Sequence, residues 1–160
     1  MADVDLRRFE ARDAPWLVDV HQRLYARDEG FDDSFGQLVE KALDDFLSGH
    51  DPHCEAGWIA ERDGQPMGSI FCVRLHQETA KLRLFLLVPE ARGQGLGKHM
   101  LETCLSFARS VGYRQLRLWT HESHRAACAL YKARGFRCLS SKPVRSFGVD
   151  LVEQSWEIDL

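Results

Sequence analysis

Hydrophobic side chains recur along this chain at two spacings, and the change between them separates a helical first third from a strand-rich remainder. Up to residue 49 they return every three or four positions, the period of an amphipathic α-helix. A first helix is expected with Asp13 as its cap, Pro15 in its first turn, and an inner face of Leu17, Val20, His21 and Leu24. A second, capped within residues 32–34 and ended by Gly49 and Pro52, carries the stripe Phe35, Leu38, Val39, Ala42, Leu43, Phe46 and Leu47.

The remainder predicts mainly strands, beginning with two on either side of the hairpin turn Asp63-Gly64. Including a short first strand, the predicted strands are Val4–Phe9, Trp58–Arg62, Met67–Leu75, Ala80–Val88, Gln115–Thr120, Phe136–Ser140 and Leu151–Leu160. One further helix follows the glycine-rich segment at residues 92–97. Another is capped by Ser123, continues through Arg134 and ends at Gly135. The predicted order is therefore β-α-α-β-β-β-α-β-α-β-β.

The most informative segment lies between a strand and a helix. An apolar run ends at Pro89, and soon afterwards come Arg92, Gly93, Gln94, Gly95, Leu96 and Gly97, followed by Lys98. The first N–H groups of a helix lack backbone partners, and the helix dipole is positive there, so this position favours an anion. Glycines let a phosphate approach the backbone and permit positive φ. The segment therefore predicts a phosphate-binding loop.

Two common phosphate loops do not match this segment. A P-loop requires Lys and then Ser or Thr after its last glycine, whereas Lys98 and His99 follow Gly97. A dinucleotide fingerprint opens the first βα unit with wider glycine spacing, whereas this one is compressed and lies past the middle of the chain. A plain glycine-rich turn is the remaining simple alternative.

The segment resembles the Arg/Gln-x-x-Gly-x-Gly/Ala signature of the GCN5-related N-acetyltransferase (GNAT) family, with Arg92, Gly95 and Gly97 at the signature positions. The resemblance implies an α/β (α+β) fold, with a mixed, mostly antiparallel and splayed sheet of about seven strands flanked by four helices. It also implies acetyl-CoA as co-substrate, with its pyrophosphate held by residues 92–98. Backbone N–H groups around Leu86 and Leu87 would hold the thioester carbonyl.

A second segment, residues 129–136, resembles the family's A-x-x-x-Y-x-x-x-G-F pattern. The resemblance implies that Tyr131 protonates the departing thiol; the alternative is that Tyr131 belongs to the core. Where members often carry an Asn that contacts coenzyme A, this chain has His124. The general base is not fixed by either motif. Glu122 is the best carboxylate candidate and Glu78 a weaker one, although Glu122 also fits a solvated position near a helix cap.

The segment between the first two helices is expected to contact the acceptor, because the family places it at the acceptor site. It combines the aromatic residues Tyr25, Phe31 and Phe35 with four carboxylates, Asp28, Glu29, Asp32 and Asp33. That composition suits a cationic amine, and Tyr25, Glu29 and Phe31 are the candidate contacts. The alternative is that the carboxylates only cap a helix and face water.

A closer likeness joins several short segments to the acetyltransferase half of bacterial proteins that fuse a MarR-type regulator to this fold. These segments include residues 58–61, 81–84, 118–120, 146–152 and 156–157. No winged-helix portion accompanies them here. The resemblance therefore implies a free-standing catalytic module without a DNA role.

Composition narrows the remaining possibilities. The 160 residues suit one domain, residues 1–160, and a net charge of −3 does not point to nucleic acid or to an anionic membrane surface. Residues 1–5 are acidic and no secretory signal is visible. The odd set of five cysteines, with no C-x-x-C pair, predicts small buried thiols in a reducing cytoplasm. His121, His124 and Cys128 could together suggest a metal site, but no fourth ligand lies nearby in the sequence, so no bound metal is expected.

We therefore expect a cytoplasmic N-acetyltransferase that acts on a small-molecule or peptide amine, with a homodimer possible by family likeness. The rival from another class is a binding module, in which the fold serves as an acyl-CoA sensor or a partner-docking domain without turnover. The departure at His124 and the unassigned base are the features that favour the rival.

Overall fold

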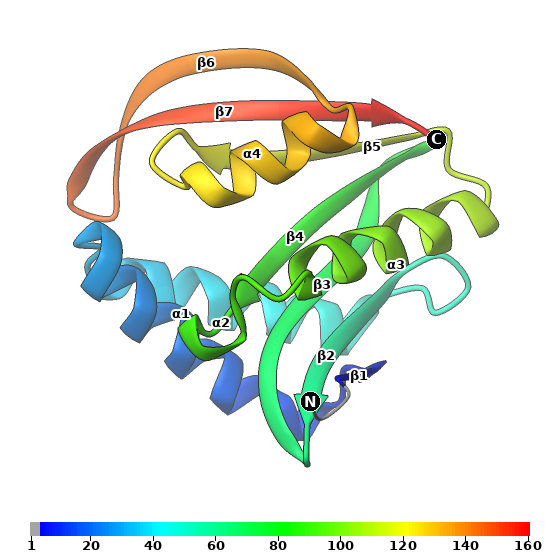
Figure 1. Cartoon of the computed structure of the whole chain (residues 1–160), viewed down its shortest axis with the longest axis horizontal. Helices are drawn as coiled ribbons and strands as arrows, with labels where there is room; N and C mark the ends of the chain where they lie inside the picture. Colours follow the sequence, from blue (N-terminus) through cyan, green and yellow to red (C-terminus); the bar gives the residue numbers. More distant parts are fainter. Residues whose placement is uncertain (1–3) are drawn as a thin grey trace.

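The computed structural model describes residues 4–160. The expectation that the chain starts without a secretory signal concerns residues 1–5, of which the first three lie outside this range. The described residues form one mixed sheet of seven strands in the order β1-β2-β3-β4-β5-β7-β6 (Figure 1). The strands and α-helices are β1 (Asp5–Arg8), α1 (Ala14–Glu29), α2 (Asp33–Gly49), β2 (Ala56–Arg62), β3 (Gln65–His76), β4 (Thr79–Leu87), α3 (Leu96–Ser110), β5 (Gln115–His121), α4 (Arg125–Arg134), β6 (Arg137–Ser146) and β7 (Val149–Asp159).

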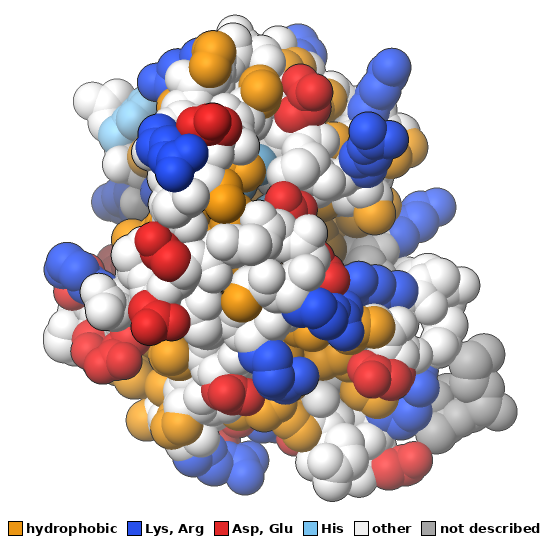
Figure 2. Space-filling view, turned by 90° about the vertical axis from the view of Figure 1, so that its left-hand side faces the viewer, with side chains coloured by type: hydrophobic (Ala, Val, Ile, Leu, Met, Phe, Trp, Pro, Cys, Tyr) orange, Lys and Arg blue, Asp and Glu red, His pale blue; other side chains and the backbone are white. Residues whose placement is uncertain are grey.

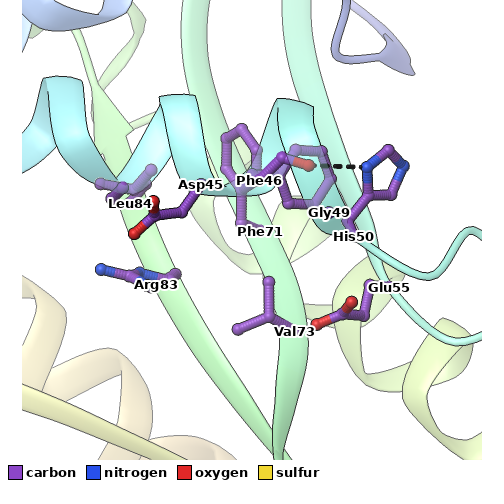
Figure 3. A pocket seen from close by; sticks show the side chains of 10 residues that line it. Asp45, Phe46, Gly49, His50, Glu55, Phe71, Val73, Arg83 and Leu84 are labelled. Carbon is purple, nitrogen blue, oxygen red and sulfur yellow. Dashed lines mark hydrogen bonds between the residues drawn. The ribbon is translucent and has the colours of Figure 1, made fainter.

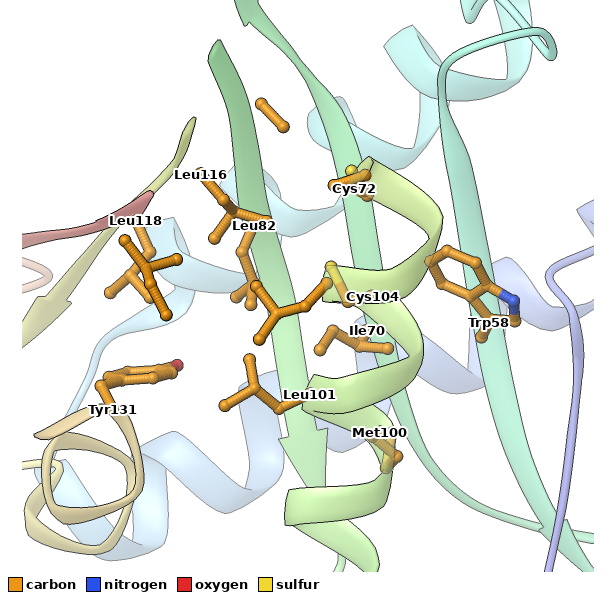
Figure 4. Close-up of a cluster of buried hydrophobic side chains, with 14 of the residues drawn as sticks. Trp58, Ile70, Cys72, Leu82, Met100, Leu101, Cys104, Leu116, Leu118 and Tyr131 are labelled. Atoms are coloured by element: carbon orange, nitrogen blue, oxygen red, sulfur yellow. The ribbon is translucent and has the colours of Figure 1, made fainter. Parts of the chain in front are cut away.

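The helices cover both faces of the sheet, and each face has its own core. On one face the apolar stripes of α1 and α2 pack on Ile59, Phe71 and Leu86. On the other, α3 and α4 pack on the remaining inward side chains of the strands (Figure 1). Figure 4 shows the second core, in which Met100 and Leu101 of α3 lie against the strands and both are almost fully buried. We refer below to the α1/α2 face and the α3/α4 face.

The sheet is split at its middle. β4 and β5 are parallel neighbours, but they pair only from Thr79–Lys81 to Gln115–Arg117. Beyond these residues the two strands diverge, while β4 stays paired with β3 and β5 with β7. The facing backbone groups beyond Lys81 therefore have no ladder partner across the split.

A bulge in β4 reverses the direction of its side chains. Ala80 and Leu82 belong to the core of the α3/α4 face, but Leu84 and Leu86 pack on the α1/α2 face. The reversal occurs at Leu84, which has a positive φ of 51° and whose carbonyl accepts a hydrogen bond of 2.6 Å from the buried Ser69 hydroxyl. Phe85 and Leu87 consequently face α3 and α4.

The predicted order of elements is confirmed, and most boundaries agree within a few residues. The exception is β6, which was predicted to end at Ser140 but continues to Ser146. It is an edge strand with almost all of its residues exposed, so it has no hydrophobic alternation to reveal it. Pro143, which cannot donate to a ladder, is tolerated at such an edge.

Asp13 is the N-cap residue of α1 as predicted, but the predicted side-chain caps form neither at α1 nor at α4. Asp13 precedes α1, but its carboxylate accepts hydrogen bonds from the Glu10 N–H (2.8 Å) and from Arg7 instead. Helix α4 begins after His124 rather than Ser123 and has no side-chain cap. The cap predicted within residues 32–34 is confirmed, because the Asp32 carboxylate accepts a hydrogen bond from the Ser34 N–H at 3.0 Å.

Two other expectations about burial are partly wrong. Leu38 and Leu47 of the α2 stripe are 48% and 40% exposed, because the stripe is wider than the surface that α2 covers. All five cysteines are free; Cys54, Cys72 and Cys104 are buried as expected, but Cys128 is half-buried and Cys138, on the edge strand β6, is exposed.

Candidate functional site

The split between β4 and β5 opens into a cleft of about 930 Å³. Its lining comes from both faces of the sheet: Tyr131 of α4 on one side and Leu38 of α2 on the other both border it. The end of α1, the loop before α3 and the turn between β6 and β7 complete the lining. A ligand in this cleft would therefore pass between the strands rather than lie on one surface.

The glycine-rich loop lies between β4 and the start of α3, as the sequence predicted, and it lines the α3/α4 end of the cleft. Gly93 and Gly95 have positive φ values of 75° and 79°, and a Cβ at either would meet no atom within 4 Å, so the space in front of the backbone is open. Helix α3 makes its first hydrogen bond from the His99 N–H to the Gly95 carbonyl, at 3.1 Å. The preceding N–H groups of the helix are therefore left for a ligand.

The loop residues contribute to the cleft in different ways. Arg92, Gly97 and Lys98 line it, and the Arg92 Nε donates to the Leu87 carbonyl at 3.1 Å. The side chains of Gln94 and Leu96 do not line it. Gln94 bonds to Arg62 (2.7 Å) and to the Glu90 carbonyl (3.1 Å), and Leu96 is buried in the core. These two residues can contribute only backbone groups to a ligand.

Tyr131 satisfies both interpretations drawn from the sequence, because it lines the cleft and is also only 3% exposed. Figure 4 shows its ring at the edge of the α3/α4 core, extending from α4 toward the other labelled side chains. Burial raises the pKa of the phenol well above its usual value. The hydroxyl is therefore protonated at neutral pH and can act as a donor.

Two histidines and a carboxylate gather where the end of α1 meets the start of α4. The His124 Nε2 lies 3.5 Å from the Glu29 Oε1, and the Glu29 side chain is only 13% exposed. Burial lowers the pKa of His124, although the Glu29 charge opposes this. Burial also lowers the pKa of the adjacent His121, whose ring centroid is 5.6 Å from that of His124. Both imidazoles are therefore neutral at pH 7 and can accept a proton.

A third histidine that lines the cleft, His21, lies in the middle of α1 and is only 2% exposed. Its Nδ1 lies 2.8 Å from the Leu17 carbonyl, which fixes Nδ1 as the protonated donor. The opposite nitrogen, Nε2, is buried without a hydrogen-bond partner among residues 4–160. Burial lowers the pKa of His21 to about 4. The sequence placed His21 on the inner face of α1 but gave no signal that it would border a cleft.

The predicted acceptor segment forms an aromatic wall. The rings of Tyr25, Phe31 and Phe35 pack on one another with centroids 4.7 to 5.5 Å apart, and Phe147 of the β6–β7 turn joins them. The Asp32 N–H bonds the Phe147 carbonyl at 2.9 Å, which ties the two turns together. Phe31 is 3% exposed, so its ring is largely occupied by packing. Burial, and secondarily the Glu29 charge, raises the pKa of Tyr25 to about 12.

The four carboxylates of this segment do not act as one acidic surface. Asp32 caps α2, and Asp28 pairs with Arg27 at 2.9 Å. Only Asp28 and Glu29 line the cleft, and Glu29 faces His124. Acidic and basic side chains are intermixed on the molecular face that lies on the left of Figure 1 (Figure 2). Capping therefore accounts for Asp32, and Asp28 and Glu29 have partners within the chain.

The candidate bases named from the sequence lie outside the cleft. Glu122 is exposed in the turn after β5, where its N–H bonds the Val152 carbonyl, and its side chain does not line the cleft. Glu78 is 61% exposed and faces Arg114 in another turn. We do not retain either as the base.

Residues 4–160 contain no group of three or more His, Cys, Asp or Glu side chains placed to hold a metal ion. Nor does the described part of the chain include a helix long and apolar enough to cross a membrane.

The described residues thus combine a sheet split between β4 and β5 with a glycine loop at a helix start, and the two border one continuous cleft. The family model described as the acetyltransferase (GNAT) family matches residues 15–136, and the chain belongs to that family. Human N-acetyltransferase 8B is 34% identical over 85 residues, which cover 50% of this chain and 37% of that protein. Mouse N-acetyltransferase 8 is 33% identical over 108 residues, covering 64% and 44%. The matches thus span less than half the length of these relatives.

Solved structures share the fold at low identity. The ribosomal-protein-alanine N-acetyltransferase of Brucella melitensis aligns over 98% of this chain and 99% of its own, with a TM-score of 0.78 and 18% identity. The yncA protein of Salmonella typhimurium, solved with its cofactor acetyl-CoA, aligns over 99% and 95%, with a TM-score of 0.78 and 15% identity. At these identities the likeness establishes the fold: the predicted seven-stranded GNAT sheet with its four helices is confirmed.

The buried His21 makes a testable contribution to stability. Its pKa is about 4 in the folded protein against 6.5 ordinarily, so between these values the unfolded chain binds more protons. Stability should therefore fall as the pH drops, by roughly 2 kcal/mol between about pH 7 and pH 5. In His21→Asn, which keeps a donor near the Leu17 carbonyl, this component should disappear. Urea unfolding at the two pH values measures it.

The matched control is His53→Asn, because the His53 side chain is 93% exposed. It should keep the full pH dependence of the wild type. An equal pH dependence in His21→Asn and wild type would show that His21 is not held neutral by burial.

Proposed function

We propose that this protein transfers an acetyl group from acetyl-CoA directly to the amine of a small molecule or peptide. The observation that carries the proposal is the single cleft that is lined from both faces of the sheet through the β4–β5 split. Such a passage lets two substrates meet end to end, with the glycine loop on one side and the aromatic wall on the other. Direct transfer requires both to be bound together, so positioning supplies much of the rate.

The residues at the α3/α4 end fit a diphosphate. The free N–H groups at the start of α3 and the open space before Gly93 and Gly95 would accept phosphate oxygens. Arg92, Lys98 and Arg125 also line this cleft and add positive charge. When bound, acetyl-CoA supplies an acetyl group activated as a thioester. Backbone N–H groups of β4 around Leu86 and Leu87, beyond its paired stretch with β5, are proposed to hold the thioester carbonyl.

We assign the proton transfers to Tyr131 of α4 and to His124, the residue immediately before this helix. As the amine nitrogen attacks the carbonyl carbon, a C–N bond forms, the C–S bond breaks, and nitrogen loses a proton while sulfur gains one. Tyr131, protonated and lining the cleft, is proposed to donate to sulfur. His124, two helical turns before it, is proposed to accept the proton from nitrogen, with Glu29 stabilising the resulting imidazolium. The contacts of His124 with Glu29 and Tyr25 support this role over the coenzyme contact inferred from the resemblance.

Several broader expectations stay proposals. The five free cysteines support a reducing, cytoplasmic location. A single domain over residues 1–160, a homodimer, the absence of nucleic-acid and membrane partners, and the likeness to the acetyltransferase half of MarR-type fusions are further hypotheses. The rival function, an acyl-CoA sensor without turnover, shares the cleft and the loop. Release of free thiol from acetyl-CoA in the presence of an amine panel separates the two.

The loop assignment predicts a specific loss of binding. In Gly97→Val, a Cβ would already contact the Leu87 and Leu130 side chains at 3.4 and 3.8 Å, so the added methyl groups must extend toward the phosphate space. Affinity for acetyl-CoA should fall by roughly a hundredfold or more, because several charge-assisted hydrogen bonds are lost. Arg92→Ala should cost less, since the backbone supplies most donors. Titration calorimetry measures both.

Gly49→Val serves as the control, because Gly49 is the last residue of α2 and a Cβ there would meet nothing within 4 Å. It should bind acetyl-CoA as the wild type does. If Gly97→Val is folded by circular dichroism and keeps wild-type affinity, the phosphate site lies elsewhere.

The role of Tyr131 predicts an effect on turnover rather than on binding. Tyr131→Phe removes only the hydroxyl, so kcat should fall by roughly 10²–10⁴ while the KM for acetyl-CoA changes little. The control is Tyr113→Phe, because Tyr113 is also buried but its hydroxyl donates to the Cys54 carbonyl at 2.9 Å. That variant should lose some stability and keep its kcat. A near-normal kcat in Tyr131→Phe would return this residue to a purely structural role.

A further inference from the structure

Two basic side chains of β4, Lys81 and Arg83, lie in the half of the cleft on the α1/α2 face. We call this the acceptor half, because the proposed amine would bind there. Ala80 and Leu82 point into the α3/α4 core, so Lys81 and Arg83, which alternate with them before the bulge, face α1 and α2. On the neighbouring β5, Trp119 faces the same way, and the Lys81 Nζ lies 5.1 Å from the centre of its ring. All three border the cleft.

Neither cation is in ion-pair contact with an anion of the described chain, although the charge of Asp45 acts on Arg83 and raises its pKa against the effect of burial. Among residues 4–160, Lys81 and Arg83 form no hydrogen bond and no ion pair with another side chain. Asp45 of α2 lies on the same side as Arg83 (Figure 3), but it is paired with Lys41 at 3.1 Å. Both basic side chains are half-buried, and burial lowers the pKa of each. A partly desolvated cation without a counter-ion is costly, and a bound anion would offset that cost.

A neighbouring arginine of the same sheet, in contrast, has an anionic partner. Arg117 of β5 faces Lys81 in the parallel register, and its guanidinium binds the Glu157 carboxylate at 2.6 Å. In the cleft itself, the carboxylates that could compete are otherwise engaged. Glu29 faces His124 at 3.5 Å, and Glu153 lies 3.9 Å from Lys142. Lys81 and Arg83 are thus left facing the cleft.

Apolar surface lies on either side of the two cations. Leu38 of α2 and Trp119 of β5 are 48% and 41% exposed, and both line the cleft. Exposed large hydrophobic side chains inside a cleft are suited to an apolar group of a ligand. The acceptor half therefore offers a cationic patch and an apolar surface next to each other, in addition to the proton-accepting cluster of His124 and Glu29.

We propose that the acceptor amine also carries a carboxylate and an apolar substituent, as an apolar or aromatic amino acid does, and that Lys81 and Arg83 bind the carboxylate. The inference rests on the proposed acetyl transfer and narrows its substrate class. It replaces the cationic amine expected from the sequence. That expectation depended on four carboxylates, whereas Asp32 and Asp28 are held within the chain and Glu29 faces His124.

The test compares three amines of matched shape: L-phenylalanine, L-phenylalaninamide and phenethylamine. Only the first has a carboxylate, and the amide is its neutral isostere. The kcat/KM for L-phenylalanine should exceed those for the other two amines by on the order of tenfold to a hundredfold. A further pair, β-alanine and 2-aminoethyl phosphate, compares carboxylate with phosphate. Product formation from acetyl-CoA is followed by mass spectrometry.

Variants locate the preference. Lys81→Met and Arg83→Met keep an apolar stem but remove the charge, and each should lower the acid-to-amide ratio several-fold, with the double variant near unity. The KM for acetyl-CoA should not change. Arg109→Met removes an equal charge from the exposed end of α3 and should leave the ratio at its wild-type value.

The outcomes separate this inference from the proposed function. If amines are acetylated but the amide equals or exceeds the acid, or the phosphate is preferred to the carboxylate, the carboxylate site is wrong and the transferase assignment stands. If no amine is acetylated, the transferase assignment fails. Calorimetry with N-acetyl-L-phenylalanine and its amide then tests the carboxylate site alone. Equal affinities for the acid and the amide would overturn the site. Tighter binding of the acid that is lost in the double variant would support it.

Discussion

The separation of β4 from β5 is the constraint on which the rest of the structure depends. The two strands share backbone hydrogen bonds only at Thr79–Lys81, and beyond that point each is held from its outer side. Backbone groups in the interior of a sheet are costly when they have no partner. A cleft that admits water or a ligand resolves this cost. The split therefore creates the site and, at the same time, the set of backbone donors that the site can use.

The elements around the split contribute according to the face they cover. On the α3/α4 face the glycine loop brings free N–H groups to one end of the cleft, and Tyr131 borders its interior. On the α1/α2 face the aromatic wall lines the cleft, and the hydrogen bond from the Asp32 N–H to the Phe147 carbonyl ties its two turns together. The bulge at Leu84 connects the two environments, because it changes which side chains of β4 each face receives. Geometry at one strand thus determines what both halves of the cleft present.

Local sequence predicted the order of the elements and the position of the glycine loop well because these signals are local. The α2 stripe and the glycines at 93, 95 and 97 are each determined by near neighbours along the chain. The bulge at Leu84 was not predicted: the sequence predicts one strand over residues 80–88, and the uninterrupted apolar run from Leu84 onward hides the change of face. β6 was predicted too short because an exposed edge strand carries no alternation.

The acceptor half was the least predictable part of the site. Its chemistry depends on contacts between distant segments, such as His124 with Glu29 and Lys81 with Trp119. The sequence identified Glu29 and Tyr25 from the family resemblance and offered Asp32 as a helix cap, but it did not reveal that Asp28 pairs with Arg27. It identified no role for His21, which it placed only among the residues of the inner face of α1. Pairing between charges becomes visible only once the chain is folded.

A crystal structure of the protein with acetyl-CoA tests the central claim most directly. We expect pyrophosphate oxygens within about 3 Å of N–H groups in residues 95–98. The thioester should lie between β4 and β5, its carbonyl bonded to a β4 backbone N–H near Leu86 or Leu87 and its sulfur near the Tyr131 hydroxyl. A coenzyme bound on one surface of the sheet, with the split closed or filled by side chains, would contradict the account.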